Sequence, residues 1–129
     1  MISVKITTER IDHNKEITSV KTSLEVGSVV SFLGTVRSEN DRVKSLVYEH
    51  YEEMAKSTIE RMGEEAIKRF GVESISVVHR FGQIPAGEDV VLVTVSSKHR
   101  AEGFEACSWL IKKIKEKVPI WKETSKAKS

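Results

Sequence analysis

Apolar and polar residues alternate along several short segments of this chain, a pattern typical of β-strands that bury one face. The pattern predicts strands over residues 2–6, 27–37, 43–51, 73–84 and 89–97. Gly34 interrupts the second of these segments, which indicates a bulge or a close approach of another backbone. A Pro-Ala-Gly-Glu turn over residues 85–88 joins the last two strands.

Helical periodicity appears in two longer segments. In residues 52–70 apolar side chains recur at steps of three and four, and Gly71 follows as a predicted C-cap. A second helix is predicted over residues 100–117, since Pro119 ends it. A short helix over residues 14–26 is a weaker feature of the pattern.

The order of these elements predicts a single α+β domain over residues 1–129, with an antiparallel or mixed sheet and two main helices. The chain shows no repeats and no second domain. Its last residues, KETSKAKS (122–129), are polar, and we expect a flexible tail from about residue 123 that is disordered without ligand.

Composition narrows the class of protein. No apolar run approaches the roughly 20 residues of a membrane helix, and the first ten residues lack the apolar run of a signal peptide. A single cysteine, Cys107, excludes an internal disulfide and suits a reducing cytoplasm. We therefore expect a cytoplasmic protein that has no contact with membranes.

The net charge is +2, but it is unevenly distributed. Residues 109–129 contain seven lysines and two glutamates, whereas the remainder has an excess of acidic residues. A basic C-terminal segment on a mildly acidic body indicates a local anionic partner, and it differs from the broad basic face of a nucleic-acid binder.

Lys115 lies on the edge of the predicted apolar face of the second helix, about 60° from its centre at 100° per residue. The residues that form this face are Phe104, Cys107, Ile111, Ile114 and Val118. Partial burial there would make the Lys115 amine more available as a base or nucleophile. The alternative is a lysine that buries its stem and extends its ammonium group to water.

His99 and Arg100 lie where the last predicted strand ends and the second helix begins. Helix N-termini bind anions, and the guanidinium group of arginine suits phosphate. The alternative is that both side chains are simply solvated. Arg37, at the end of residues 34–37, is ambiguous in the same way.

Other chemistry finds little support in the sequence. Cys107 falls on the apolar face, where a thiol usually serves packing, so sulfur chemistry would need an external sulfur source. His13, His50 and His79 have neither helical pair spacing nor cysteine partners, and we expect no metal and no bound cofactor. Nucleophile-triad, P-loop and dinucleotide motifs are also missing.

Several segments together resemble the large, catalytic subunit of molybdopterin synthase. They are VVSFLGTVR (29–37), LVYEHYEEM (46–54), VVHRFGQIPAGEDVVLVTVSSKHRAEGFEA (77–106) and VPIWKE (118–123). The likeness covers residues 27–123 in the same order, and it implies an α/β-hammerhead-like fold.

The resemblance implies a sulfurtransferase of molybdenum cofactor biosynthesis. Such enzymes convert cyclic pyranopterin monophosphate, also called precursor Z, to molybdopterin. Sulfur arrives as a thiocarboxylate on the C-terminal Gly-Gly tail of a small ubiquitin-like carrier subunit. The family forms a homodimer that binds two carriers, giving a heterotetramer, and its pocket is completed across the dimer interface.

The resemblance also assigns roles to residues. Arg37, His99 and Arg100 match anchors for the phosphate and pterin, Lys115 matches the central catalytic lysine, and Lys122 matches a second catalytic cation. The full predicted substrate-binding set is Thr35, Val36, Arg37, His99, Arg100, Lys115, Lys122, Glu123 and Thr124.

Two departures from the family pattern leave alternatives open. Relatives usually continue past the Trp-Lys pair with a longer segment, often containing Gly and Trp, whereas only KETSKAKS follows Trp121 here. Glu123 also follows Lys122 directly, where relatives commonly place another residue first. One alternative is therefore a non-catalytic dimeric module that binds the carrier without turnover. Another is a small nucleic-acid-binding domain, although Trp109 and Trp121 form no stacking platform with the lysines.

Overall fold

The computed structural model describes residues 1–37, 42–46, 51–118 and 121–125. The elements in chain order are β1 (Ile2–Thr7), α1 (His13–Ser19), β2 (Ser28–Thr35), β3 (Arg42–Leu46), α2 (Tyr51–Phe70), β4 (Ser74–Arg80), β5 (Asp89–Ser97), α3 (Arg100–Lys117) and β6 (Trp121–Ser125). The predicted α+β class, with its two main helices, is confirmed.

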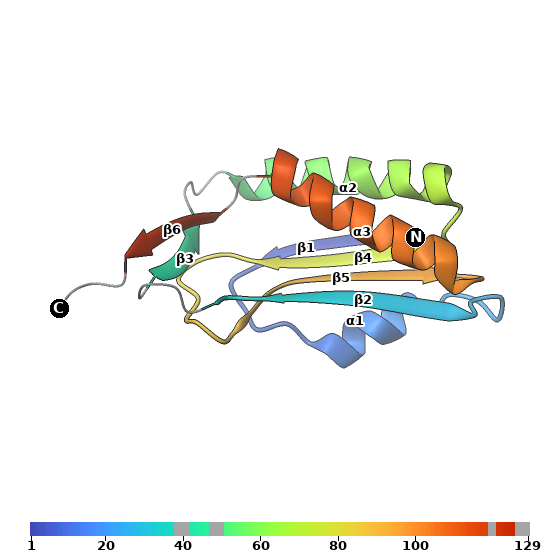
Figure 1. Ribbon diagram of the computed structural model, residues 1–129, viewed down its shortest axis with the longest axis horizontal. Helices are drawn as coiled ribbons and strands as arrows, with labels where there is room; N and C mark the ends of the chain where they lie inside the picture. Colours follow the sequence, from blue (N-terminus) through green and yellow to red (C-terminus); the bar gives the residue numbers. More distant parts are fainter. Residues whose placement is uncertain (38–41, 47–50, 119–120, 126–129) are drawn as a thin grey trace.

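The central sheet is mixed and has the strand order β1-β4-β5-β2 (Figure 1). β1 and β4 are parallel, with Val4 opposite Val77, while β5 is antiparallel to both of its neighbours. β2 pairs with β5 from Ser28 opposite Ser97, and the register shifts between Gly34 and Thr35, which confirms the predicted irregularity. A separate two-stranded sheet joins β3 and β6.

Helices α2 and α3 cover one face of the central sheet, and α1 lies against the other (Figure 1). The main apolar core fills the space between the sheet and the two long helices. Its fully buried members include Ile59, Ile75, Val95 and Leu110. Because β4 and β5 are central strands covered on both faces, most of their residues are buried, polar ones such as Ser76 and Thr94 included.

Helix α2 ends as the sequence predicts. The Gly71 amide donates to the carbonyl oxygen of Ile67 at 2.9 Å, and Gly71 has a φ of 70°. Glycine adopts this left-handed backbone without steric cost, so it ends the helix and turns the chain into β4.

Helix α3 approaches the sheet closely through small residues. A Cβ atom on Gly103 would lie 2.9 Å from Ser97 Oγ and 3.2 Å from Val30 Cγ2. Gly103 and Ala106 therefore face the sheet, and Phe104 is 60% exposed. The predicted apolar face was wrong at Phe104, because close packing selected small side chains rather than the largest apolar one.

Other boundaries also differ from the sequence-based expectation: β4 ends at Arg80 instead of residue 84, and β2 spans residues 28–35 instead of 27–37. Helix α1 ends at Ser19 instead of residue 26, and Tyr51 begins α2 rather than ending a strand. The tail is expected to be disordered, whereas residues 121–125 form strand β6, which pairs with β3. The polar sequence of β6 gave no strand signal because its backbone partner lies about 80 residues away in the chain. Residues 47–50 of the predicted third strand and residues 126–129 of the tail lie outside the described residues.

Polar side chains line the face of the sheet under α1. Ser76 and Thr94 are fully buried there, and Glu16 of α1 is only 3% exposed. The Glu16 carboxylate accepts hydrogen bonds from Lys5 Nζ at 2.8 Å and from Ser76 Oγ at 2.5 Å. This polar contact, rather than apolar burial alone, attaches α1 to the sheet.

Within the described residues, no helix is both long and apolar enough to cross a membrane. In the same part of the chain, no group of three or more His, Cys, Asp or Glu residues is placed to hold a metal ion.

Candidate active site at the two ends of helix α3

The predicted site residues divide between the two ends of α3, which runs back along β5 after following it in sequence (Figure 1). Near its start Gly103 contacts Ser97 and Val30, and in its middle Cys107 Sγ lies 3.9 Å from the carbonyl oxygen of Val93. The last turns of α3 therefore lie at the end of the sheet where β5 begins and β2 ends. We call this the lysine end, and the opposite end the His99 end.

Lys115 lies in the last turn of α3, at the lysine end. Lys115 is exposed, whereas Ile114 beside it is buried, so the lysine lies next to the apolar face of the helix. The neighbouring Lys113 contacts the Trp109 ring, with Nζ 5.8 Å from the centroid, and lies 3.9 Å from Glu116. Within the part of the chain that the structure describes, Lys115 forms no ion pair, so its amine is available to a ligand.

Thr35, Val36 and Arg37 continue from β2 at the same end. Val36 is buried, and its amide donates to the carbonyl oxygen of Glu88 at 2.9 Å. Its own carbonyl oxygen accepts from the Gly87 amide at 2.7 Å. Both backbone polar groups of Val36 are thus bound within the protein, while Thr35 and Arg37 on either side are exposed.

Lys122, Glu123 and Thr124 lie on β6, where their backbones pair with Ser45, Lys44 and Val43 of β3. β6 begins four residues after α3 ends at Lys117. These three predicted site residues therefore follow the lysine end of α3 closely in the chain. Their side chains lie outside what the structure describes.

His99 and Arg100 form the other end of α3, and both are exposed. His99 is the N-cap residue, and its amide donates to Glu102 Oε2 at 3.1 Å. Hydrogen bonds from the backbone amides of Glu102 itself and of His99 hold the pKa of the Glu102 carboxyl below its usual value of 4.5, against a smaller effect of burial. Glu102 thus already occupies the anion-binding N-terminus, so a ligand anion there would be held by the side chains of His99 and Arg100.

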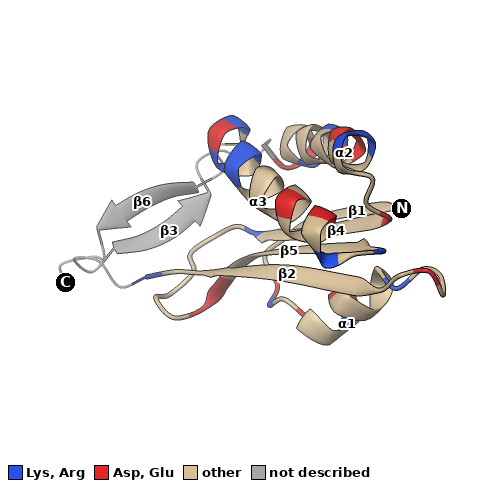
Figure 2. Cartoon of the chain, turned by 45° about the vertical axis from the view of Figure 1, so that its right-hand side comes forward, with Lys and Arg blue, Asp and Glu red and all other residues tan. Residues whose placement is uncertain are grey.

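The two ends are far apart within one chain. Fifteen residues of α-helix separate Arg100 from Lys115, which corresponds to about 22 Å at 1.5 Å per residue. Basic residues mark both ends of α3, with acidic residues between them (Figure 2). One chain therefore carries two separate halves of the predicted site and does not bring them together.

Cys107 is buried between α3 and β5, as predicted. Burial raises the pKa of its thiol from 9.0 to about 11, so the thiolate, the reactive form, is scarce at neutral pH. Cys107 therefore cannot serve as a ready sulfur nucleophile.

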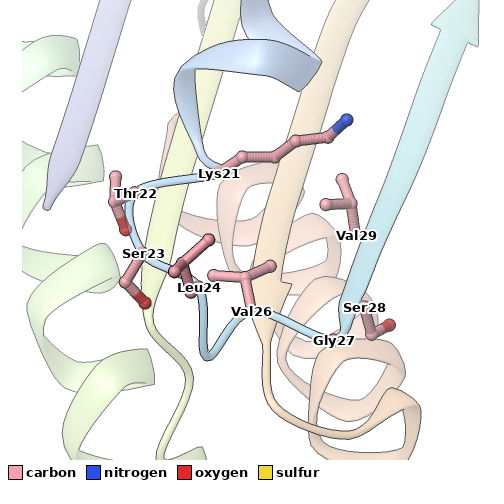
Figure 3. Close-up of a pocket in the computed structure, with 8 residues that line it drawn as sticks. All are labelled: Lys21, Thr22, Ser23, Leu24, Val26, Gly27, Ser28 and Val29. Carbon is pink, nitrogen blue, oxygen red and sulfur yellow. The ribbon is translucent and has the colours of Figure 1, made fainter.

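A surface hollow of about 660 Å³ lies elsewhere, beside the loop that joins α1 to β2 (Figure 3). Its lining residues are Lys21, Thr22, Ser23, Leu24, Val26, Gly27, Ser28 and Val29. Only one of them is charged, and none belongs to the predicted site. The hollow lacks the convergent cations that a phosphorylated ligand requires.

Sequence reasoning missed an ionic network behind the lysine end. Arg80, at the end of β4, donates through Nη1 to Glu88 Oε1 at 3.2 Å and to the carbonyl oxygen of Asp89 at 2.9 Å. The His-Arg-x-Gly and Pro-Ala-Gly-Glu segments mark both partners in the sequence. Their contact depends on the β4–β5 pairing, which no local pattern reveals.

The chain belongs to the family described as MoaE protein, whose family model matches residues 6–117. The fold agrees with this assignment, since the solved structures that it resembles carry the same family description. It confirms the family and the fold class that the sequence predicts.

Relatives and solved structures carry related names. The molybdopterin synthase catalytic subunit of Pyrococcus abyssi is 44% identical over 110 residues, which is 84% of this chain and 74% of that protein. Molybdopterin cofactor biosynthesis protein E from Burkholderia multivorans has a TM-score of 0.86 at 29% identity, covering 97% of this chain and 84% of that one. Molybdopterin synthase from Staphylococcus aureus has a TM-score of 0.82 at 29% identity, covering 95% of this chain and 91% of that one.

Proposed function

We propose that this chain is the catalytic subunit of a molybdopterin synthase. It converts cyclic pyranopterin monophosphate to molybdopterin, with sulfur from the thiocarboxylated C-terminus of a small ubiquitin-like carrier. Family membership and the names of the relatives support the enzyme and its place in molybdenum cofactor biosynthesis. The observation that carries the site assignment is the placement of cations at both ends of α3, at the positions where the family resemblance requires them.

The separation of those ends supports a homodimer. A small phosphorylated pterin cannot contact both Arg100 and Lys115 of one chain across about 22 Å. A two-fold axis that reverses one copy against the other brings the His99 end of one subunit to the lysine end of its partner. One dimer then has two complete sites, each with residues from both chains.

Strand β2 offers a surface for that dimer. It is an edge strand, paired on one side with β5 in the described sheet, and it runs from the His99 end to the lysine end. Phe32 and Leu33 on it are 37% and 39% exposed. Apolar side chains on an open strand edge favour association with another chain. Antiparallel pairing of two β2 strands is the arrangement that places opposite ends side by side.

The chemistry assigned to each residue follows from its charge and position. Arg100 and Arg37 hold the phosphate and pterin through hydrogen bonds from charged donors, and His99 adds a ring nitrogen beside Arg100. Lys115, exposed at the end of α3, meets the incoming carrier tail, whose sulfur bonds to the precursor to give a thioester. When water attacks the carbonyl of that thioester, Lys115 stabilises the oxyanion that forms; the carrier then leaves as a carboxylate and its sulfur stays on the precursor. Lys122 is the second cation, and Thr35, Val36, Glu123 and Thr124 complete the predicted surroundings.

The carrier must supply the sulfur because the buried thiol of Cys107, with its pKa near 11, is a poor nucleophile. Two carriers per dimer give a heterotetramer, and the surplus lysines near the lysine end attract an acidic carrier surface. A cytoplasmic location is part of the proposal, supported by the single, unpaired cysteine.

The test is a single-turnover assay with purified protein, thiocarboxylated carrier and cyclic pyranopterin monophosphate, with product measured as an oxidised fluorescent pterin. We expect product from the natural chain, nearly complete loss with Lys115→Ala, and a small effect with Lys112→Ala as the matched control. Tight carrier binding without product would instead identify the non-catalytic binding module. Nucleic-acid binding that weakens steeply with salt would favour the third class.

A further inference from the structure

Arg80 is a buried cation for which the proposed chemistry gives no role. It is 7% exposed at the end of β4, and its guanidinium contacts Glu88 Oε1 and the carbonyl oxygen of Asp89 through Nη1. Among the described residues its Nε has no hydrogen-bond partner. A buried guanidinium is costly unless it is paired, so the Glu88 carboxylate is its essential counter-charge.

Glu88 in turn holds the residue that precedes Arg37. Its carbonyl oxygen accepts from the Val36 amide at 2.9 Å, and the adjacent Gly87 amide donates to the Val36 carbonyl oxygen at 2.7 Å. Gly87 has a φ of 92°, a conformation that suits glycine and lets the turn present both groups to Val36. Val36 is thus fixed on both sides, one residue before Arg37.

Arg80 acts at a distance from the reacting groups. Side chains alternate along β4, so Arg80 projects from the same face as Ser76, which bonds to Glu16 of α1. Helix α3, with Lys115 in its last turn, lies over the other face, where Leu110 and Ile114 belong to the same core as Val77. Arg80 therefore lies on the opposite face of the sheet from α3, and it affects the chemistry at Lys115 only through other residues.

We propose that Arg80 and Glu88 are positioning residues that set the place of Arg37 by anchoring the turn that holds Val36. The proposal rests on the proposed function, since it takes Arg37 to be an anchor for the precursor. A fixed anchor gives tighter binding, because a guanidinium displaced by about 1 Å loses its alignment with the phosphate oxygens. Loosening the turn weakens precursor binding more than it slows the chemical step.

The kinetic test uses the dimer with its carrier. Glu88→Ala and Arg80→Lys should each raise the precursor KM by roughly five- to tenfold and leave kcat within about twofold. In an Arg37→Ala background neither change should raise KM further, since both act through Arg37. Arg10→Gln is the matched control: its exposed guanidinium lies 3.8 Å from the other Glu88 oxygen and should leave KM unchanged. Unchanged KM in the two variants, or a full further increase without Arg37, would overturn the proposal.

A second measurement separates this proposal from the assigned activity. Amide hydrogen exchange by NMR should become at least about tenfold faster at Val36 and Gly87 in Glu88→Ala and Arg80→Lys, while the amide of Val93 in β5 keeps its rate. An absence of turnover in the natural chain would defeat the synthase assignment, but the exchange rates would still decide the anchoring role. Unchanged rates at Val36 and Gly87, or equal acceleration at Val93, would contradict it.

Discussion

Lys5 Nζ lies 2.8 Å from Glu16 Oε2, and this ion pair attaches helix α1 to edge strand β1. The second oxygen of the Glu16 carboxylate accepts from Ser76 on the neighbouring strand β4. Burial opposes ionisation of this carboxyl, but the hydrogen bonds from Lys5 and Ser76 and the charges of Lys5 and Lys15 outweigh it and lower its pKa below 4.5. A single carboxylate therefore links three elements.

Glu16→Gln should reduce the free energy of unfolding at pH 7 by about 1–2 kcal/mol, a modest value because Lys5 is partly exposed. The native state favours the charged form of Glu16, so this contribution is complete above the unfolded pKa and is lost as the pH falls through the lower, folded pKa. Urea unfolding at pH 7 and at pH 3 should show a smaller difference between variant and natural chain at pH 3 than at pH 7. Glu65→Gln, which removes an exposed partner of Arg69, is the control and should cost less than about 0.5 kcal/mol. An equal difference at both pH values would contradict the prediction.

His79 should make the fold sensitive to mild acid. Burial lowers the pKa of its imidazole from 6.5 to about 4, although the hydrogen bond from Nδ1 to the Arg80 carbonyl oxygen partly opposes this. The unfolded chain takes up a proton below pH 6.5 while the folded chain remains neutral there, so stability is lost between pH 6.5 and about 4, by up to about 3 kcal/mol. Urea midpoints at pH 7.5, 6 and 5 measure this slope. His79→Gln should reduce the change of the urea midpoint with pH, whereas the exposed His99→Gln should leave that change as it is. If the His79→Gln midpoint changed with pH as much as that of the natural chain, another group would cause the acid sensitivity.

Shared sites predict complementation between two inactive chains. Lys115→Ala should abolish turnover with the dimer intact, and Arg100→Ala should chiefly weaken precursor binding, so that its own dimers are inactive at a low precursor concentration. A mixed dimer of the two has one site with both residues intact and one with neither. After statistical exchange of subunits, half of the dimers are mixed and activity should recover to about a quarter of the natural level. Single-turnover assays before and after unfolding and refolding the mixture provide the measurement, and no recovery would show that each chain carries its own complete site.

The thiol of Cys107 should be inert in the folded protein. With a pKa near 11 and little exposure, it should react with iodoacetamide only in denaturant, where the thiolate is accessible. Cys107→Ala should keep full turnover and lose about 1 kcal/mol of stability from the small cavity that it leaves. Mass spectrometry of the alkylated protein, with activity of the variant, checks both parts. Loss of turnover in a stable Cys107→Ala chain would assign the thiol a chemical role after all.

The sequence predicts those elements whose signals are local. Strand β5 and helix α3 have the predicted bounds, since a turn precedes the strand and Pro119 follows the helix. Strand β6 has no local signal, because its polar residues become a strand only by pairing with β3. Phe104 shows the same limit within a predicted helix, where the close approach at Gly103 decides which side faces the sheet.

The candidate site shows a comparable division. Residue types and family likeness identify His99, Arg100, Lys115 and Lys122, and helical geometry already sets the first pair apart from Lys115 by about 22 Å. In the proposed dimer a second copy joins the two halves, and a single sequence does not display that copy. The support given by Arg80 and Glu88 was also missed, because it exists only once β4 and β5 are paired.

Helix α3 restricts how the gene can change in length. Each residue added between Gly103 and Lys115 advances the helix by about 1.5 Å and rotates everything beyond it by about 100°. Such an insertion would move the Lys115 side chain to a different face of the helix. If Lys115 kept its place, the insertion would instead rotate Gly103 out of its contact with Val30. Two insertions would not repair the rotation, and only about a whole turn would restore the face while displacing the amine by some 5 Å. Members with this architecture should therefore differ in length in their loops and termini, while the interval from His99 to Lys115 stays constant.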